Sequence, residues 1–151
     1  MPSQRLSFRY ELQEFLFLTF LQRKEKIYAD QLWDMISSAK SDFKQALDII
    51  FTSRDAVNKT KYRLVEKHLI DTTREALQTK RADTFPEMCR INNNGEKWWS
   101  EKEHQLLDLA TQDLKDAYFE AERKVKFNPS ISTDDYLIAV SKLLAQLVNN
   151  K

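Results

Sequence analysis

Glycine is nearly absent from this chain, and its scarcity excludes many folds. Gly95 is the single glycine among 151 residues, where average usage of about 7% predicts roughly ten. Barrels, sandwiches and glycine-lined nucleotide pockets need repeated turns with positive φ, which glycine supplies most easily. The composition therefore favours a helical protein.

Disulfides, a long apolar run and a net charge of one sign are also missing. The one cysteine, Cys89, cannot form an intramolecular disulfide, so we expect a cytoplasmic protein rather than a disulfide-stabilised secreted domain. The longest apolar run, residues 15–21, is much shorter than the roughly twenty residues of a membrane span. Glu11 and Glu14 stand where a signal peptide would carry positive charge, so we expect no targeting segment. With 24 basic and 23 acidic side chains, no global field attracts the chain to nucleic acid or to a membrane.

Apolar periodicity is what the chain does contain. The prolines stand at 2, 86 and 129, which leaves residues 3–85 without the two strongest breakers of helices. Apolar residues recur at spacings of three and four, as on one face of a helix. These stripes predict helices over about residues 5–26, 30–52, 57–80, 100–127 and 133–148. Residues 6–13 also alternate with a period of two, so a strand over residues 5–13 stays open.

One segment interrupts the helical pattern. Residues 82–99 contain Pro86 and the run Asn92-Asn-Asn-Gly95, which tolerate turns and left-handed backbone. Ser100 then forms a capping box with Glu103, which predicts the start of the next helix. We therefore expect an all-α fold, a single helical domain over residues 1–151. It would be a bundle of four or five mostly antiparallel helices with one long loop around residues 82–99.

Enzyme chemistry has few residues to work with. His68 and His104 are the only histidines, which limits histidine-based triads and metal sites. Glu101-Lys-Glu-His104 has the spacing of a di-iron helix motif, but Val65 stands where a second motif would need a glutamate before His68. We expect no metal, no cofactor and no small-molecule substrate, and a non-catalytic protein.

The segment Arg63-Leu-Val-Glu-Lys-His68 suggests one catalytic alternative. Its Arg-x4-His spacing resembles that of the HEPN family of ribonucleases, which are also all-α. The resemblance implies Arg63 and His68 as catalytic residues. An arginine there would stabilise phosphorane-like charge while the histidine moves the proton of a 2′-hydroxyl. Leu64 departs from the family, in which a polar residue usually follows the arginine.

A basic stretch over residues 54–67 gives a nucleic-acid-binding alternative. It carries five basic side chains against two acidic ones, a local charge of +3. The residues assigned to phosphates under this alternative are Lys59, Lys61, Arg63 and Lys67. Pairs such as Asp55 with Lys59 instead predict a salt-bridged, solvated face. A helix-turn-helix over residues 29–51 is a further alternative, although Asp42 and Asp48 give its second helix no positive edge.

Protein binding is the function that the sequence favours. The predicted helix 133–148 has a wide apolar face, and Trp98 stands just before the predicted cap Ser100. We expect a non-catalytic interaction module, an adaptor, inhibitor or assembly factor, that buries this face against a partner helix or a second copy. The residues assigned to the partner are Trp98, Tyr136, Val140, Leu143 and Leu147. The same face also fits the core of the bundle, so both interpretations stay open.

Overall fold

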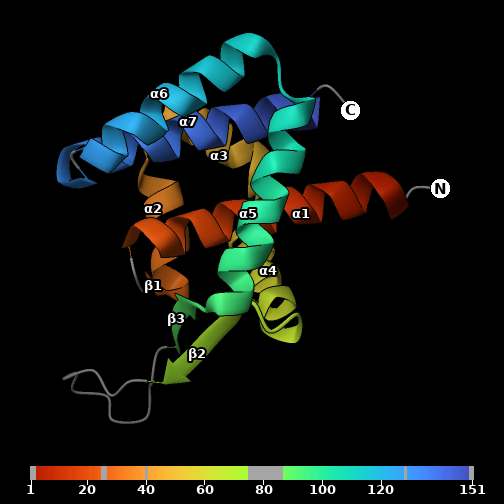
Figure 1. The fold of residues 1–151 in the computed structure, drawn as a ribbon. Helices are drawn as coiled ribbons and strands as arrows, with labels where there is room; N and C mark the ends of the chain where they lie inside the picture. The colour runs from red at the N-terminus through yellow and green to blue at the C-terminus, as the bar shows by residue number, and fades with distance from the viewer. Residues whose placement is uncertain (1–2, 25–26, 40, 75–86, 128, 150–151) are drawn as a thin grey trace.

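The computed structural model describes residues 3–24, 27–39, 41–74, 87–127 and 129–149, and confirms that the chain is mainly helical (Figure 1). Its helices are α1 (Ser3–Lys24), α2 (Ala29–Ser38), α3 (Ser41–Ile50), α4 (Arg54–Glu66), α5 (Asn93–Leu109), α6 (Gln112–Phe127) and α7 (Pro129–Asn149). Its strands are β1 (Ile27–Tyr28), β2 (Ile70–Arg74) and β3 (Glu87–Ile91). These described segments hold seven helices, more than the four or five expected. The single-domain organisation stays a prediction.

Helix α1 forms the buried centre of the molecule. All residues from 12 to 21 are buried, and α1 packs against α4, α5, α7 and β3. A helix that is apolar on nearly every side needs neighbours on every side. The apolar run of residues 15–21 accordingly lies in the core, and residues 5–13 belong to the helix rather than to a strand.

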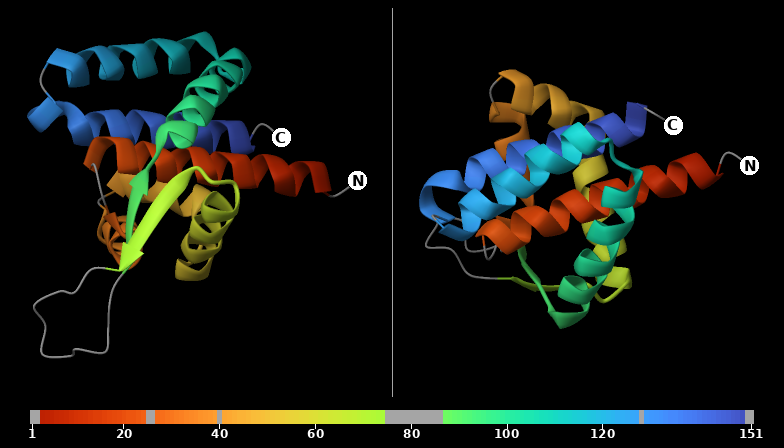
Figure 2. Two further views of the ribbon diagram at one scale, coloured as in Figure 1. Left: turned by 60° about the horizontal axis from the view of Figure 1, so that its bottom comes forward. Right: turned by 45° about the horizontal axis from the view of Figure 1, so that its top comes forward.

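The three strands form a small antiparallel sheet in the order β1-β3-β2. Strands β2 and β3 make a hairpin in which Ile70 pairs with Ile91, and β1 places Ile27 opposite Cys89. Ile27, Ile70 and Cys89 are buried in the main core. The hairpin is thus attached to the helical core at the end where β2 leaves α4 (Figures 1 and 2).

The predicted helix over residues 57–80 is wrong after Glu66, where α4 ends and strand β2 follows. The sequence Ile70-Asp-Thr-Thr73 is rich in β-branched residues, which favour a strand over a helix. Thr72 had fitted the helical stripe only by spacing. Residues 75–80 lie outside the described part of the chain.

The predicted loop over residues 82–99 is wrong in its described part. Strand β3 and the first turns of α5 occupy it, and residues 82–86 lie outside the described residues. The side chain of Asn92 caps α5 by accepting a hydrogen bond from the backbone N–H of Gly95 at 2.9 Å. Asparagine is among the best N-cap residues, so the predicted start at Ser100 lies about two turns too late.

Gly95 stands where the start of α5 approaches the end of α4. A Cβ atom at this position would run into the backbone oxygen of Leu69 and would lie 2.7 Å from Cγ1 of Ile91. The N–H of Asn92 also donates to that Leu69 oxygen at 3.2 Å. The single glycine of the chain therefore permits a close backbone contact.

Two of the predicted helices are divided in the structure. The segment 30–52 is divided into α2, which ends at Ser38, and α3, which begins at Ser41. The segment 100–127 breaks at Ala110, where ψ is 153°, and the hydroxyl of Thr111 then accepts a hydrogen bond from the N–H of Leu114. The apolar spacing keeps its phase across both corners, so it did not reveal them.

Helices α6 and α7 form an antiparallel pair (Figure 2). Helix α7 packs against α3 and α1 on the sides that α6 does not cover, whereas α6 packs chiefly against α7. Helix α6 is therefore an outer layer of the molecule. Among the described helices, none combines the length and the apolar character needed to cross a bilayer.

Candidate nucleic-acid interface

Helix α4 has one face in the core and one in solvent. Its buried residues are Val57, Thr60, Lys61 and Leu64. Its exposed residues include Asp55, Lys59, Tyr62, Val65 and Glu66. Tyr62 is 59% exposed, which is unusual for a large aromatic side chain. This solvent-facing side of α4 is the part of the helix that is available for a contact with another molecule.

Helix α4 begins at Arg54, three residues before the start predicted near residue 57. Ser53 is the N-cap, and its hydroxyl accepts a hydrogen bond from the N–H of Ala56 at 3.1 Å. Arg54, at the first position of the helix, lies 3.9 Å from Asp34 of α2. Helix α4 also packs against α2 and α1, so its position is fixed from two sides.

A buried carboxylate holds α4 against α1. Glu14 of α1 is 0% exposed. Its Oε2 lies 3.4 Å from Nε of Arg63, and its Oε1 accepts a hydrogen bond from Nζ of Lys67. Buried charges occur in pairs because an isolated one is costly to desolvate. Glu14 therefore requires both basic residues of α4 at their present places.

Neutral polar groups complete this buried cluster. Nη2 of Arg63 donates to the side-chain oxygen of Gln13 at 2.9 Å and to the hydroxyl of Thr60 at 3.0 Å. Its guanidinium group also stacks on the ring of Tyr10, 3.9 Å from the centroid. Gln13 donates in turn to the backbone oxygen of Ile50 at 2.9 Å. The cluster links α1, α4 and the end of α3.

The basic row predicted for phosphate binding is thus largely used inside the molecule. Arg63 and Lys67 pair with Glu14, and Lys61 is buried with its ammonium 4.3 Å from the Tyr62 ring centroid. Lys59 pairs with Asp55 at 3.1 Å but is 69% exposed. Of the four predicted residues, Lys59 is the one that projects fully into solvent.

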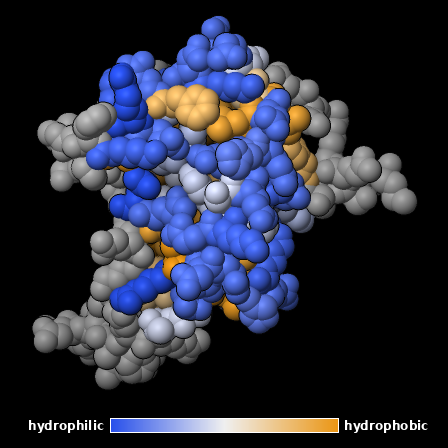
Figure 3. Space-filling view, viewed as in Figure 1, coloured by the Kyte–Doolittle hydropathy of each residue, from blue (hydrophilic) through white to orange (hydrophobic). Residues whose placement is uncertain are grey.

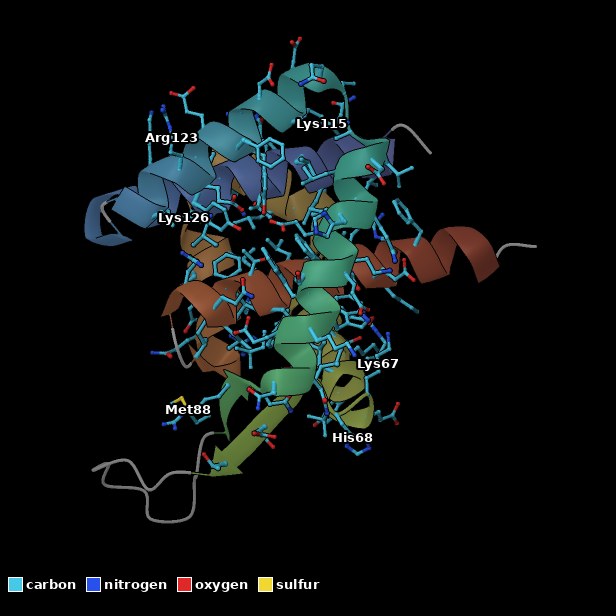
Figure 4. All side chains as sticks on the ribbon, in the orientation of Figure 1. Lys67, His68, Met88, Lys115, Arg123 and Lys126 are labelled. Atoms are coloured by element: carbon cyan, nitrogen blue, oxygen red, sulfur yellow. The ribbon has the colours of Figure 1, made fainter. Side chains whose placement is uncertain are left out.

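The structure does not bring Arg63 and His68 together as the ribonuclease alternative requires. The guanidinium group of Arg63 points to α1, as described above. His68 lies beyond the end of α4, is exposed, and has a φ of 60°. The two residues are not on one helix, because α4 ends at Glu66. Figure 4 shows Lys67 and His68 at this end of α4.

The hairpin and α5 are fastened to the same end of α4. The backbone oxygen of His68 accepts hydrogen bonds from the side-chain amides of Asn92 and Asn94, at 3.0 and 3.4 Å. Asn92 also donates to Asp71 of β2 at 3.2 Å. On β3, Arg90 is exposed. Helix α4, the hairpin and α5 therefore form one corner, with exposed polar side chains on α4 and β3.

The face predicted to bind a protein partner lies in the chain's own core. Tyr136, Val140, Leu143 and Leu147 of α7 are each at most 3% exposed. They belong to the same hydrophobic cluster as α1. The core interpretation that the sequence left open is the one that this burial supports. In this fold the α7 face is covered by the chain itself.

The two tryptophans of α5 have different surroundings. Trp99 stacks on Phe15 with a centroid distance of 5.1 Å, and its Nε1 donates to the hydroxyl of Thr19 at 2.8 Å. Trp98 is half-buried, and its ring centroid lies 5.7 Å from the ammonium of Lys67 and 5.3 Å from that of Lys102. Trp98 is therefore covered by two basic side chains.

Sequence reasoning missed a second polar cluster, between α5, α6 and α7. The hydroxyl of Tyr118 donates to Glu103, and the hydroxyls of Tyr118 and Tyr136 lie 3.1 Å apart. The guanidinium of Arg23 lies 5.1 Å from the centroid of the Tyr136 ring. Glu103 and Tyr118 were predicted far apart on one helix, and Arg23 and Tyr136 on two others. No local spacing therefore indicated that these residues meet.

Burial shifts the titration of this second cluster. Desolvation raises the pKa of the Glu103 carboxyl, the hydrogen bond from Tyr118 lowers it, and the nearby Glu122 carboxylate raises it again. Desolvation also raises the pKa of Tyr136 to about 12 and raises the pKa of Tyr118. In the described segments, no group of three or more His, Cys, Asp or Glu residues is placed to hold a metal ion.

Comparisons with known proteins do not assign this chain to a protein family. No protein-family model, no curated protein and no solved structure matches this chain. What the described residues offer is an anchored helix, α4, with a solvent-facing side and an antiparallel hairpin next to it.

Proposed function

We propose that the protein binds double-stranded DNA as a winged helix-turn-helix protein. Helix α4 would enter the major groove, and the β2–β3 hairpin would lie against the neighbouring backbone. The proposal keeps the nucleic-acid alternative of the sequence but replaces its basic row by the outward face of α4. The cytoplasmic location expected from the sequence stays a prediction.

The order of the elements supports this proposal. Helices α2, α3 and α4 follow one another with short connections, α4 packs on α2 and α1, and a hairpin follows. In helix-turn-helix proteins the last helix of such a unit lies in the major groove while the preceding helices support it. Because a fold alone does not define a function, the solvent-facing side of α4 has to carry the argument.

The observation that carries the proposal is the contrast between the two sides of α4. Its inner side is fixed by the buried Glu14 cluster, while its outer side presents Lys59 and the 59%-exposed Tyr62. A rigid helix with an unoccupied polar and aromatic face suits base contacts, which need side chains held in a defined register.

The outward side chains have matching chemistry for a DNA groove. Lys59 can bind guanine or phosphate, and the Tyr62 ring can contact a thymine methyl group. Asp55 and Glu66 can accept a hydrogen bond from the cytosine amino group. These carboxylates also repel phosphates, so we expect modest non-specific affinity and a clear dependence on sequence.

Fluorescence anisotropy with labelled DNA duplexes of random sequence tests the proposal. We expect weak binding at low salt that weakens further as salt is added, and an affinity about tenfold lower in Lys59→Glu. Tyr62→Ala should lower the affinity for duplexes selected by the wild-type protein more than the affinity for the random pool.

Lys124→Glu is the matched control for Lys59→Glu. Lys124 of α6 is 56% exposed and pairs with Glu120 at 3.8 Å, as Lys59 pairs with Asp55 one turn earlier. The proposal fails if no duplex binds at low salt, or if both substitutions reduce binding equally. Cleavage of RNA that is lost in His68→Gly would instead support the ribonuclease alternative.

A further inference from the structure

The outer face of α6 carries an exposed apolar side chain near the middle of the helix. Phe119 is 50% exposed, although its edge contacts the ring of Tyr118. Helix α6 packs on α7 through its other side, where Tyr118, Ala121 and Val125 are buried. In Figure 3, apolar surface interrupts the hydrophilic surface at the top of the molecule, where α6 lies. Nothing in the described chain covers Phe119 on its solvent side.

Charges of opposite sign flank Phe119 on the same stripe. Asp116 lies one turn before it and Arg123 one turn after it, and residues three, four and seven apart share one side of a helix. Both charged residues are exposed. In Figure 4, Arg123 projects from α6 away from α7. Along the helix, this stripe therefore runs from the negative Asp116 through the apolar Phe119 to the positive Arg123.

Such a stripe is complementary to its own reversed copy. When two identical helices pack antiparallel about a two-fold axis, a residue before the centre meets a residue after the centre on the other helix. With the axis beside Phe119, Asp116 of one copy comes opposite Arg123 of the partner subunit, and the reverse pair forms as well. The two Phe119 side chains then face each other across the axis, at the same height along it, and cover each other.

We propose that a second copy of this chain docks antiparallel on α6, with Phe119 at the centre and the Asp116–Arg123 pairs on either side. This surface differs from the α7 face that the sequence assigned to self-association. The occupant is argued from charge: a partner with a uniformly charged helix would repel one half of the stripe, whereas a second copy satisfies both halves.

Glu120 is the group that opposes this arrangement. It would face its own copy across the axis, at the edge of the interface opposite to Phe119. Within one chain it already has two cations nearby, since its Oε1 lies 3.9 Å from Arg123 and 3.8 Å from Lys124. These exposed intrachain pairs are weak, so Arg123 can turn to Asp116 of the partner subunit while Lys124 stays with Glu120.

Sedimentation equilibrium of charge-reversed variants tests the docking surface. Asp116→Arg and Arg123→Asp should each raise the dimer dissociation constant at least tenfold, because each turns two attractive pairs into repulsive ones. An equimolar mixture of the two variants should associate as the wild type does, and so should the double variant with both changes. Phe119→Ala should weaken association without changing the helical content measured by circular dichroism.

Asp48→Arg is the matched control. Asp48 is an exposed helical carboxylate that pairs with Lys44 one turn earlier, but it lies on α3. Its reversal should leave the dissociation constant within twofold of the wild-type value. The proposal is overturned if the wild type is monomeric up to about 1 mM, a range that includes weak interfaces. It is also overturned if the mixture does not associate, or if Asp48→Arg weakens association as much as Asp116→Arg.

Discussion

His68 ends α4 in the left-handed region of the backbone. Its N–H donates to the oxygen of Val65 and the N–H of Leu69 donates to the oxygen of Leu64, both at 3.0 Å. These two bonds define a Schellman motif with His68 at the C′ position, which glycine occupies most often. A side chain at φ 60° costs energy because Cβ approaches the following carbonyl oxygen.

We expect His68→Gly to stabilise the protein by about 1 kcal/mol, since glycine removes the strain of the left-handed residue. The free energy of unfolding in urea measures the change. His104→Gly is the control, because His104 is exposed within α5 and a glycine there should cost about 1 kcal/mol. Equal losses in both variants would show that the backbone at His68 is not strained.

His68 and Gly95 both shape the corner between α4 and α5, and the sequence alone did not predict the role of either residue. The scarcity of glycine indicated a helical fold, but the Asn-rich segment around Gly95 was taken for a loop. The close approach of Leu69 that excludes a Cβ atom arises from packing between α4 and α5. Such a contact between segments more than twenty residues apart leaves no local pattern.

At the scale of elements, α4 shows how one helix combines exposed and buried cations. Lys59 and Arg63 are one turn apart and were predicted to act together on phosphates. Arg63 instead reaches the buried Glu14 of α1, while Lys59 pairs with Asp55 in solvent. The free energy that each contributes to folding should therefore differ strongly.

Arg63→Ala should destabilise the protein by about 3 kcal/mol, because the fully buried Glu14 carboxylate loses one of its two cationic partners. Lys59→Ala should cost no more than about 0.5 kcal/mol, as expected for an exposed ion pair. Urea unfolding of both variants measures the difference. Similar values for the two would mean that the Glu14 cluster does not anchor α4, and the proposed DNA-binding face would lose its rigid support.

Element prediction succeeded where the signal was local. The apolar stripe that predicted a helix from residue 57 lies on α4, and the apolar run of residues 15–21 lies in the buried centre of the molecule. The corners near residue 39 and at Ala110 were missed because the apolar stripe continues through them. The strands were missed because β2 needs β3 as a partner, and a pairing across an intervening segment is not a periodic signal.

At the scale of the whole molecule, the Glu103 cluster joins the three C-terminal helices α5, α6 and α7. Glu103 of α5 binds Tyr118 of α6, whose hydroxyl lies 3.1 Å from that of Tyr136 in α7. The sequence predicted Tyr136 to face a partner, and nothing in its spacing indicated a buried acidic group nearby. The candidate DNA surface was predicted only as a basic stretch, because the partners of its cations lie about fifty residues away in the sequence.

The raised pKa of Glu103 makes the stability of this assembly depend on pH. The folded state holds the Glu103 proton more tightly than the unfolded state does, because burial disfavours the charged carboxylate. The resulting contribution to stability is fully present below the ordinary value of 4.5 and is lost as the pH rises through the raised pKa.

We therefore expect the free energy of unfolding to fall less between pH 5 and pH 8 in Glu103→Gln than in the wild type. The glutamine keeps an oxygen that can accept the hydrogen bond from Tyr118, but it cannot ionise. Urea titrations of both proteins at the two pH values measure the difference, with Glu101→Gln as a control because Glu101 is an exposed carboxylate on the same helix. If Glu103→Gln and the wild type lose the same stability over this range, the proton held by Glu103 does not contribute to joining α5 with α6 and α7.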